Sequence, residues 1–349
     1  MDKNLIAVDL GGTRIRAAQL DRRLHILGRV EMPTRADSGP GQVIERVKAA
    51  IRQVLPENVA VAGIGVSSPG PVDPRQGAII HPPNLPGWDF VPLGSALSGE
   101  FKLPVYVGHD VNAAVLAEAI LGAARGYRHI IYLTISTGIG GGFIADDRLL
   151  LGRQGFTGEV GNIAIMVESV GTHRDAPSDD SFVGTHGCAS AVSTLEQEAS
   201  GTGLARRAIQ LIQAGGQSHI LEMAGGDLTA ITGQLVGAAA LDGDLLAREI
   251  VTRAGRLIGL GIVNLLHLFD PEIIVIGGGV TKLGDLLFDP LRETIQQHVM
   301  TEEYWRGLVI TTPQLGEDVS IYGAAMLALT QGGVTKIADV IAQLGIVSP

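Results

Sequence analysis

The chain has 349 residues, of which 46% are hydrophobic and 18% charged, so it can bury a large core and is not of disordered composition. The formal net charge is −10, which disfavours a nucleic-acid surface built from clustered lysine and arginine. The one cysteine, Cys188, excludes an intrachain disulfide and a cysteine-rich metal cluster. No apolar run reaches the roughly 18 residues of a membrane span, and the start MDKNL lacks the apolar core of a signal peptide. We expect a cytoplasmic protein that binds neither membrane nor nucleic acid.

Apolar runs bounded by turn residues alternate with helical patterns along the chain. Strand-like runs are LIAVDL, RAAQLD, LHILGRV, VAGIGVS, PVYVG, IIYLTIS, GGFIADD and EIIVIGGG. Helical spacing of apolar residues predicts helices over residues 41–55, 111–124, 204–214, 244–268, 282–298 and 320–330. Strands that give way to helices indicate α/β layers, and the length favours two domains.

The segment IAVDLGGTRIRAAQLD, which begins at Ile6, has an acidic residue and two adjacent glycines after an apolar run. Adjacent glycines let the backbone approach a ligand closely, and backbone amides together with a threonine hydroxyl can then face an anion. Taken alone, the same residues fit an ordinary glycine-rich hairpin turn equally well.

A second segment, IYLTISTGIGGGFIADDRL, begins at Ile131 and repeats this arrangement, with Asp146 at the spacing of Asp21. Two hairpins can be alike by chance, but both turns carry glycine and threonine. Two related halves that hold one polyphosphate from opposite sides explain the repeat better. A third glycine run, in DPEIIVIGGGV, follows a buried strand and precedes a helix, so a phosphate or a flat ring could lie against its backbone.

These turns, in this order and with GHDVNAA between the first two, resemble the ROK family (repressors, open reading frames and sugar kinases) of the actin/hexokinase/Hsp70 superfamily. The matching motifs are DLGGT, SSPGPVD, NLPGW, HDVNAA, STGIGGGFI, GEVG, LEQEASG and IVIGGGV, which span nearly the whole chain. The resemblance implies an α/β, ribonuclease H-like fold of two lobes with a central cleft. Residues 1–108 would form the first lobe, joined by the C-terminal segment 320–349, and residues 109–319 the second.

The resemblance also implies an ATP- and Mg²⁺-dependent sugar kinase that converts glucose to glucose 6-phosphate, with fructose, mannose, N-acetylmannosamine and N-acetylglucosamine as alternative acceptors. We expect a homodimer, which is common in the family. The residues implied for ATP are Asp9, Gly11, Gly12, Thr13, Arg14, Thr137, Gly138, Gly140, Gly278 and Gly279. Those implied for the sugar are Gly70, Asn84, His109, Asp110, Glu159, Asn162 and Glu196.

Asp110 is the candidate general base, because it follows the strand PVYVG and precedes a helix, which would project it into a cleft beside a sugar hydroxyl. Asp9 would hold the water shell of the Mg²⁺ that offsets phosphate charge. The alternatives are that Asp110 only caps its helix, that Asp9 only forms a turn and that Glu196 is an exposed helix residue. The surrounding motifs favour the functional roles.

The sequence departs from the family at its zinc site. Most members carry Glu-x-Gly-His, whose histidine binds a structural zinc together with three cysteines. Here the stretch is EVGN, so Asn162 replaces the histidine, and Gly187, Ala189 and Thr194 stand at the cysteine positions. Cys188 alone cannot build a tetrahedral site, and we expect no structural zinc.

A second departure is His109, which stands where the family usually has asparagine. Histidine can still donate to a sugar hydroxyl, but with a different reach. A sugar-responsive repressor is a less favoured function, because the eight residues before Asp9 leave no room for a DNA-reading helix. A catalytically silent binding protein is also less favoured, because Asp110 and both phosphate turns are retained.

Overall fold

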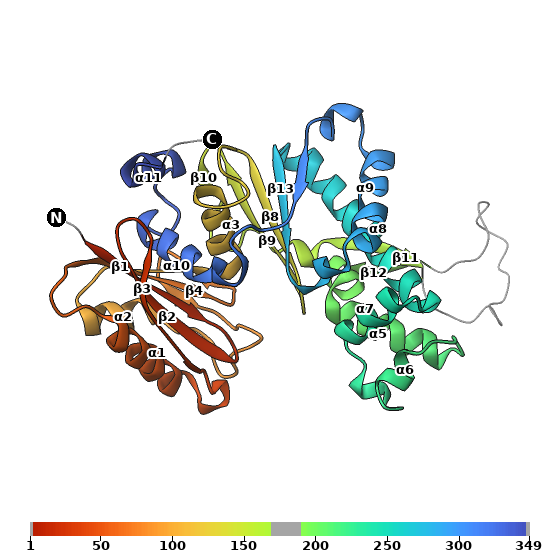
Figure 1. Ribbon diagram of the computed structural model, residues 1–349, viewed down its shortest axis with the longest axis horizontal. Coiled ribbons are helices and arrows are strands. Elements are labelled where there is room, and N and C mark those ends of the chain that lie inside the picture. Colours follow the sequence, from red (N-terminus) through yellow and green to blue (C-terminus); the bar gives the residue numbers. More distant parts are fainter. Residues whose placement is uncertain (1–2, 169–189, 347–349) are drawn as a thin grey trace.

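The structure is a computed structural model that describes residues 3–168 and 190–346, and it is built around two sheets of five strands (Figure 1). The first sheet has the order β3-β2-β1-β4-β7 and the second the order β10-β9-β8-β13-β14. The first is formed by β1 (Asn4–Leu10), β2 (Arg14–Leu20), β3 (Ile26–Pro33), β4 (Val61–Ser68) and β7 (Val105–His109). The second is formed by β8 (Ile130–Ile135), β9 (Ile139–Ala145), β10 (Arg148–Leu149), β13 (Ile273–Gly277) and β14 (Val309–Thr311).

The two sheets share one pattern of strand pairing. In the first, β1 pairs antiparallel with β2 and parallel with β4. In the second, β8 pairs antiparallel with β9 and parallel with β13. The internal repeat that the two glycine-rich segments predict is therefore confirmed, and each glycine turn joins the corresponding pair of antiparallel strands.

Both faces of each sheet are apolar. Side chains of successive strand residues point to opposite sides, so one apolar strand contributes to two cores. In β1, Ile6, Val8 and Leu10 belong to one core, while Leu5 and Ala7 belong to another. Strand β8 divides its side chains between two cores in the same way. Each sheet must consequently be covered on both faces.

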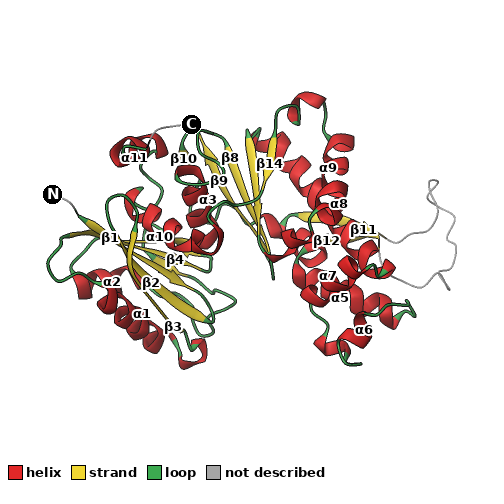
Figure 2. Ribbon diagram, viewed as in Figure 1, coloured by secondary structure: helices red, strands yellow, loops and turns green. Residues whose placement is uncertain are grey.

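Helices supply this cover (Figure 2). The outer core of the first sheet contains residues of α1 (Pro40–Val54) and α2 (Leu93–Phe101). That of the second sheet contains residues of α4 (Leu195–Ala199), α5 (Gly201–Gln213), α6 (Ile220–Met223), α7 (Gly233–Asp242), α8 (Leu245–Phe269) and α9 (Asp285–His298). A third core, shared by both sheets, contains α3 (Asp110–Ile120), α10 (Val319–Leu329) and α11 (Ile337–Leu344). Helix α3 packs on β8 and β9, α10 packs on β1 and β4, and the two helices pack on each other between the sheets.

Short elements complete the described chain. A hairpin of β11 (Ala164–Glu168) and β12 (Ser190–Thr194) flanks residues 169–189, and β5 (Val72–Asp73) pairs with β6 (Ala78–Ile79). The 3-10 helices are η1 (Ala36–Ser38), η2 (Val160–Asn162), η3 (Leu228–Ala230), η4 (Gly279–Leu283), η5 (Glu302–Tyr304) and η6 (Gly316–Asp318). None of the helices in the described part of the chain has both the length and the apolar character to cross a bilayer.

The predicted helix over 282–298 begins later than its apolar spacing indicates. Helix α9 starts at Asp285, because Gly284 has a positive φ of 56° and η4 occupies the preceding residues. Periodicity also missed α2, α7 and α11. The sequence of α7, GQLVGAAALD, is so rich in glycine and alanine that it offers little contrast between two faces.

Candidate active site

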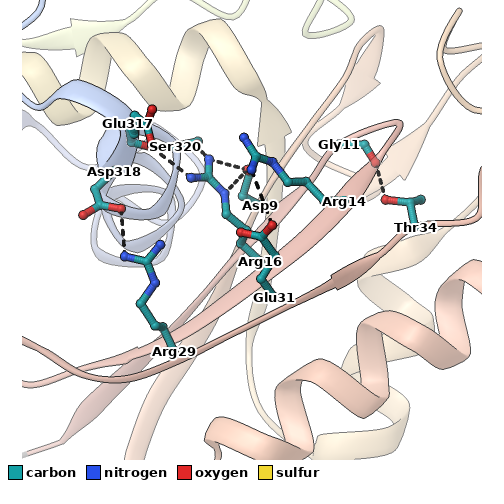
Figure 3. Close-up of polar contacts among 10 residues, drawn as sticks. All are labelled: Asp9, Gly11, Arg14, Arg16, Arg29, Glu31, Thr34, Glu317, Asp318 and Ser320. Carbon is teal, nitrogen blue, oxygen red and sulfur yellow. Dashed lines mark hydrogen bonds and ion pairs between the residues drawn. The ribbon is translucent and has the colours of Figure 1, made fainter.

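The glycine turn between β1 and β2 is tied to two other segments. The Gly11 amide donates to the Arg14 carbonyl at 2.9 Å, and the buried Thr34 donates its hydroxyl to the Gly11 carbonyl at 2.7 Å (Figure 3). A Cβ on Gly12 would lie 2.9 Å from both the Cβ and the carbonyl oxygen of Asn84, so only glycine fits without a shift. The turn implied for ATP and the loop implied for the sugar are therefore in direct contact. No pattern in the sequence signalled Thr34.

Asp9, at the end of β1, is held in an ion pair (Figure 3). Arg16 donates to Asp9 Oδ2 from Nε at 2.9 Å and from Nη2 at 2.7 Å, and the two side chains are only 12% and 16% exposed. The same guanidinium donates to the Ser320 hydroxyl at 2.6 Å and to the Glu317 carbonyl at 3.0 Å, where α10 begins. Burial raises the pKa of Asp9 above its usual 3.8, Arg16 opposes that rise, and the nearby charge of Asp110 adds to it.

This environment bears on the metal role implied for Asp9. A carboxylate whose charge is already matched by Arg16 suits contact with the water shell of Mg²⁺ better than direct ligation. Arg14, also implied for ATP, lies beside Glu31 on the neighbouring strand, with Nη1 3.4 Å from Oε1 and both side chains about half exposed (Figure 3). It therefore points along the sheet.

The junction between β7 and α3 carries the candidate base. Asp110 is the first residue of α3, and its side chain is 52% exposed. The cap position belongs to His109, which makes no side-chain cap bond, so Asp110 is not the N-cap of this helix. Asp110 Oδ1 accepts from the Val111 amide at 2.7 Å and lies 3.2 Å from His109 Nε2. A Cβ on Gly70 would lie 2.7 Å from the His109 ring, so Gly70, His109 and Asp110 are brought together.

Three other residues implied for the sugar lie on segments that pack together near the start of β9. Asn162 Nδ2 donates to Glu159 Oε2 at 3.3 Å. Glu196 Oε2 accepts from the Ile139 amide at 2.8 Å, and the Glu196 side chain lies against Gly161. Glu196 is partly buried and is not the exposed helix residue of the alternative reading. One of its oxygens already binds the second glycine turn.

A cavity of about 750 Å³ opens beside this second turn. Its wall is formed by Ser136 and Thr137 of the turn, by the first residues of α5 and α7, and by η4. The Thr202 hydroxyl donates to the Thr137 carbonyl at 2.5 Å, which joins α5 to the turn. A cavity of this size, lined both by the first residues of α5 and α7 and by apolar side chains such as Ile231 and Leu283, has room for the base and ribose of a nucleotide.

Most of the residues lining this cavity were missed. Of the residues implied for ATP, Thr137 and Gly279 line it. The missed polar and glycine positions are Ser136, Gly201, Thr202, Thr232, Gly233, Gln234, Gly237 and Lys282. Helix N-cap patterns could have pointed to them, because Ser200 caps α5 and Thr232 caps α7 with their hydroxyls.

The remaining glycines implied for ATP occupy three different settings. Gly138 lies in the second turn, where its carbonyl accepts from the Ser136 amide at 2.8 Å. Gly278 has a φ of 98° and lies against the backbone of Ile135. Gly140 is a residue of β9, opposite Thr134 and facing α3, and so it lies outside the turn.

The positions implied by the family's zinc site are only partly described. The Thr194 hydroxyl accepts from the Gln197 amide at 3.2 Å and caps α4. Gly187, Cys188 and Ala189 lie outside the described residues. Within residues 3–168 and 190–346, no group of three or more histidine, cysteine, aspartate or glutamate side chains could hold a metal ion.

Two matching sheets, a glycine turn in each and two helices packed between them define a two-lobed α/β fold of the actin/hexokinase type. The model of the ROK family matches residues 5–331, and the chain belongs to the ROK family.

Individual members of the family are similar to the chain over nearly its whole length. The chain is 34% identical to a glucokinase of Thermotoga maritima over 323 residues, which are 93% of this chain and 96% of the relative. It is 30% identical to a ROK family glucokinase from Streptomyces griseus solved with glucose and AMPPNP, with a TM-score of 0.70 over 93% of this chain and 98% of that one. A ROK family transcriptional regulator homologous to the Escherichia coli MLC protein has a TM-score of 0.74 over 97% and 81% of the two chains, but at 24% identity it shows the shared fold alone.

Proposed function

We propose that this protein is an ATP-dependent hexose kinase that converts glucose to glucose 6-phosphate. The observation that carries the proposal is the half-exposed carboxylate of Asp110 at the β7–α3 junction, in a fold whose second turn borders a nucleotide-sized cavity. The glucokinase relatives, similar over more than nine-tenths of the chain, give the same activity.

Asp110 acts as the general base. One carboxylate oxygen, Oδ1, is engaged by the Val111 amide, and the other accepts the proton of the acceptor hydroxyl as its oxygen attacks the γ-phosphorus of ATP. The bond from that phosphorus to the β–γ bridging oxygen breaks, and ADP leaves. Mg²⁺, when bound, offsets the charge of the phosphates, with Asp9 touching its water shell.

The proposed sugar contacts come from both lobes. Gly70, Asn84 and His109 lie on the side of the first sheet, and Glu159, Asn162 and Glu196 lie near the second turn. Carboxylate and amide groups bind several hydroxyls at once, which orients one of them toward Asp110. His109 and Asn162, which replace the usual family residues, are the positions that set the choice among glucose, fructose, mannose and the two N-acetylhexosamines.

ATP contacts two glycine turns. Amides of Gly12 and Thr13 face the phosphates from one lobe, where the Gly11 amide closes the turn on Arg14, whose side chain can swing toward the phosphates. Thr137 and Gly138 face them from the other lobe. Gly278 and Gly279 lie by the adenosine in the cavity.

The lobes are residues 1–108 with 320–349, and residues 109–319. We further propose a cytoplasmic homodimer, for which sedimentation equilibrium gives the direct test.

A coupled ADP-release assay with Mg·ATP and a panel of hexoses and N-acetylhexosamines tests the activity. Saturable turnover with glucose supports the proposal. Turnover that requires a different sugar corrects the acceptor, and protein that binds ATP but turns over no sugar contradicts the kinase function.

A further inference from the structure

The chain crosses from the second sheet to the first through residues 312–318, between β14 and α10 (Figure 1). We propose that Glu118 and Arg16 are positioning residues that clamp the two ends of segment 314–320 and so fix Asp9 of the phosphate turn relative to the base Asp110. This inference rests on the proposed kinase function. Neither Glu118 nor Arg16 falls in one of the motifs that carry the family resemblance.

Glu118 forms the clamp at the second sheet. It lies in α3, two turns after Asp110, and is completely buried. Its Oε1 accepts from the amides of Gln314 and Leu315, both at 3.1 Å, and its Oε2 accepts from the amide of Ala123 at 2.7 Å. Several backbone donors satisfy a buried carboxylate and fix its geometry. The helix that carries the base therefore holds the start of the crossing segment.

Arg16 forms the clamp at the first sheet (Figure 3). It donates to the Glu317 carbonyl at 3.0 Å and to the Ser320 hydroxyl at 2.6 Å, and at the same time binds Asp9. The planar guanidinium fixes several acceptors in one arrangement, which an ammonium group cannot reproduce. Asp9 is therefore held to the end of the same segment that α3 holds at its start.

The two clamps connect Asp9 and Asp110 through one short piece of chain. Phosphoryl transfer depends on the placement of the base relative to the phosphates, and a displacement of about 1 Å can reduce the rate by roughly 100-fold. Loosening either clamp should lower kcat, because Asp9 stands in β1 of the first sheet, whereas α3, which begins at Asp110 directly after β7, packs on β8 and β9 of the second. Sugar binding should change little, because neither Glu118 nor Arg16 is among the proposed sugar contacts.

The experiment compares Arg16→Met, Arg16→Lys, Glu118→Gln and the double variant Arg16→Met/Glu118→Gln with the wild type. Arg29→Met is the matched control, because Arg29 reaches the same segment only through a 3.4 Å contact with Asp318 and is 57% exposed. We expect kcat to fall roughly 10- to 100-fold in each single variant, with the Kd for sugar changed less than about threefold. The double variant should be little worse than either single one, because both clamps act through one segment. Arg16→Lys should restore little activity.

Hydrogen–deuterium exchange supplies a readout that does not depend on turnover. Exchange at residues 314–320 should rise in the Arg16 and Glu118 variants and stay unchanged in Arg29→Met. If the wild type phosphorylates no sugar but exchange is still faster in the variants, the proposed function is overturned and the clamp remains supported. Unchanged exchange, multiplicative losses of kcat in the double variant, or folded single variants with wild-type kcat would overturn the clamp.

Discussion

Gly12 shows at the scale of one residue why the glycine turn between β1 and β2 leaves no room for a side chain at this position. Its Cβ position lies within 2.9 Å of Asn84 Cβ and of the Asn84 carbonyl oxygen, and backbone cannot give way as a flexible side chain can. Gly28, on the same sheet, has open space at its Cβ position and serves as a matched control.

Gly12→Ala should therefore displace the turn or the Asn84 loop. We expect kcat/KM for ATP to fall roughly tenfold or more, in line with about 1–3 kcal/mol for overpacking, while Gly28→Ala stays near wild type. Steady-state kinetics with ATP varied at saturating sugar measures the effect. Equal kinetics for the two alanine variants would show that the close approach of Gly12 to Asn84 does not affect ATP use.

Residues of the site differ in how readily sequence reveals them. Asp9, the glycines and Asp110 stand in short local motifs, and the series of these motifs carries the family resemblance that singles them out. Arg16 was missed because its meaning depends on Ser320, 304 positions away, which only the fold brings to it. The resemblance implies that Gly140 binds ATP as part of the second turn, yet its pairing with Thr134 makes it part of β9.

At the scale of elements, α8 is a long helix of the second lobe and is capped by Asp244. The Asp244 carboxylate accepts from the amides of Ala247 and His219 and from the Ser218 hydroxyl. Burial opposes its ionised form, but these hydrogen bonds prevail and hold the pKa of Asp244 below the usual 3.8. Because the folded pKa is depressed, the stabilisation is complete above pH 3.8 and is lost as the pH falls through the folded value.

Asp244→Ala should lower the free energy of unfolding by about 1–2 kcal/mol near neutral pH, the usual effect of losing a cap. Asp244→Asn should lose less near neutral pH, and its deficit should shrink as the pH falls below 3.8. Urea unfolding at several pH values measures both, with the exposed Asp242→Asn as control. A deficit of Asp244→Asn that stays constant down to about pH 2 would contradict the assignment.

The described residues at the family's zinc positions, Asn162 and Thr194, are expected to keep their conformation without zinc. Asn162 donates to Glu159, and Thr194 caps α4, so both described positions have other roles in place of zinc ligation. Elemental analysis of purified protein should find well under one zinc per chain, and a chelator should leave the unfolding temperature unchanged. Stoichiometric zinc whose removal lowers that temperature would contradict this expectation.

Elements were predictable where the pattern is local. Runs such as IAVDL and IIYLTI alternate between two buried faces, so their strands follow from period and composition. The cavity beside the second turn was not predictable in the same way. Its wall combines the first turns of α5 and α7 with η4, which are distant in sequence and meet only after the second sheet and its helices pack.

At the scale of the whole molecule, the two lobes meet through α3 and α10 in a shared core, and the ligands are proposed to bind between and beside them. A ligand that binds the folded protein but not the unfolded chain stabilises the fold by mass action, by about 2.7 kcal/mol when the ligand concentration is 100 times Kd. Glucose together with a non-hydrolysable ATP analogue should therefore raise the unfolding temperature more than either ligand alone. Thermal scans with each ligand and with both measure this, and galactitol, an open-chain polyol, is a suitable control.

A purely additive effect of sugar and nucleotide would show that the two sites bind independently. A larger joint effect would indicate that one ligand favours the conformation that binds the other.

The most direct test of the account follows the γ-phosphoryl group of ATP into the sugar, in wild type and in Asp110→Asn measured side by side. The product is identified by phosphorus NMR, and nucleotide binding is measured by calorimetry. We expect wild type to form glucose 6-phosphate, and Asp110→Asn to lose roughly 10²- to 10⁴-fold in kcat while its Kd for the ATP analogue stays unchanged. Wild-type turnover in folded Asp110→Asn would contradict the role of Asp110 as the base, and the absence of phosphorylated sugar in the wild type would contradict the kinase itself.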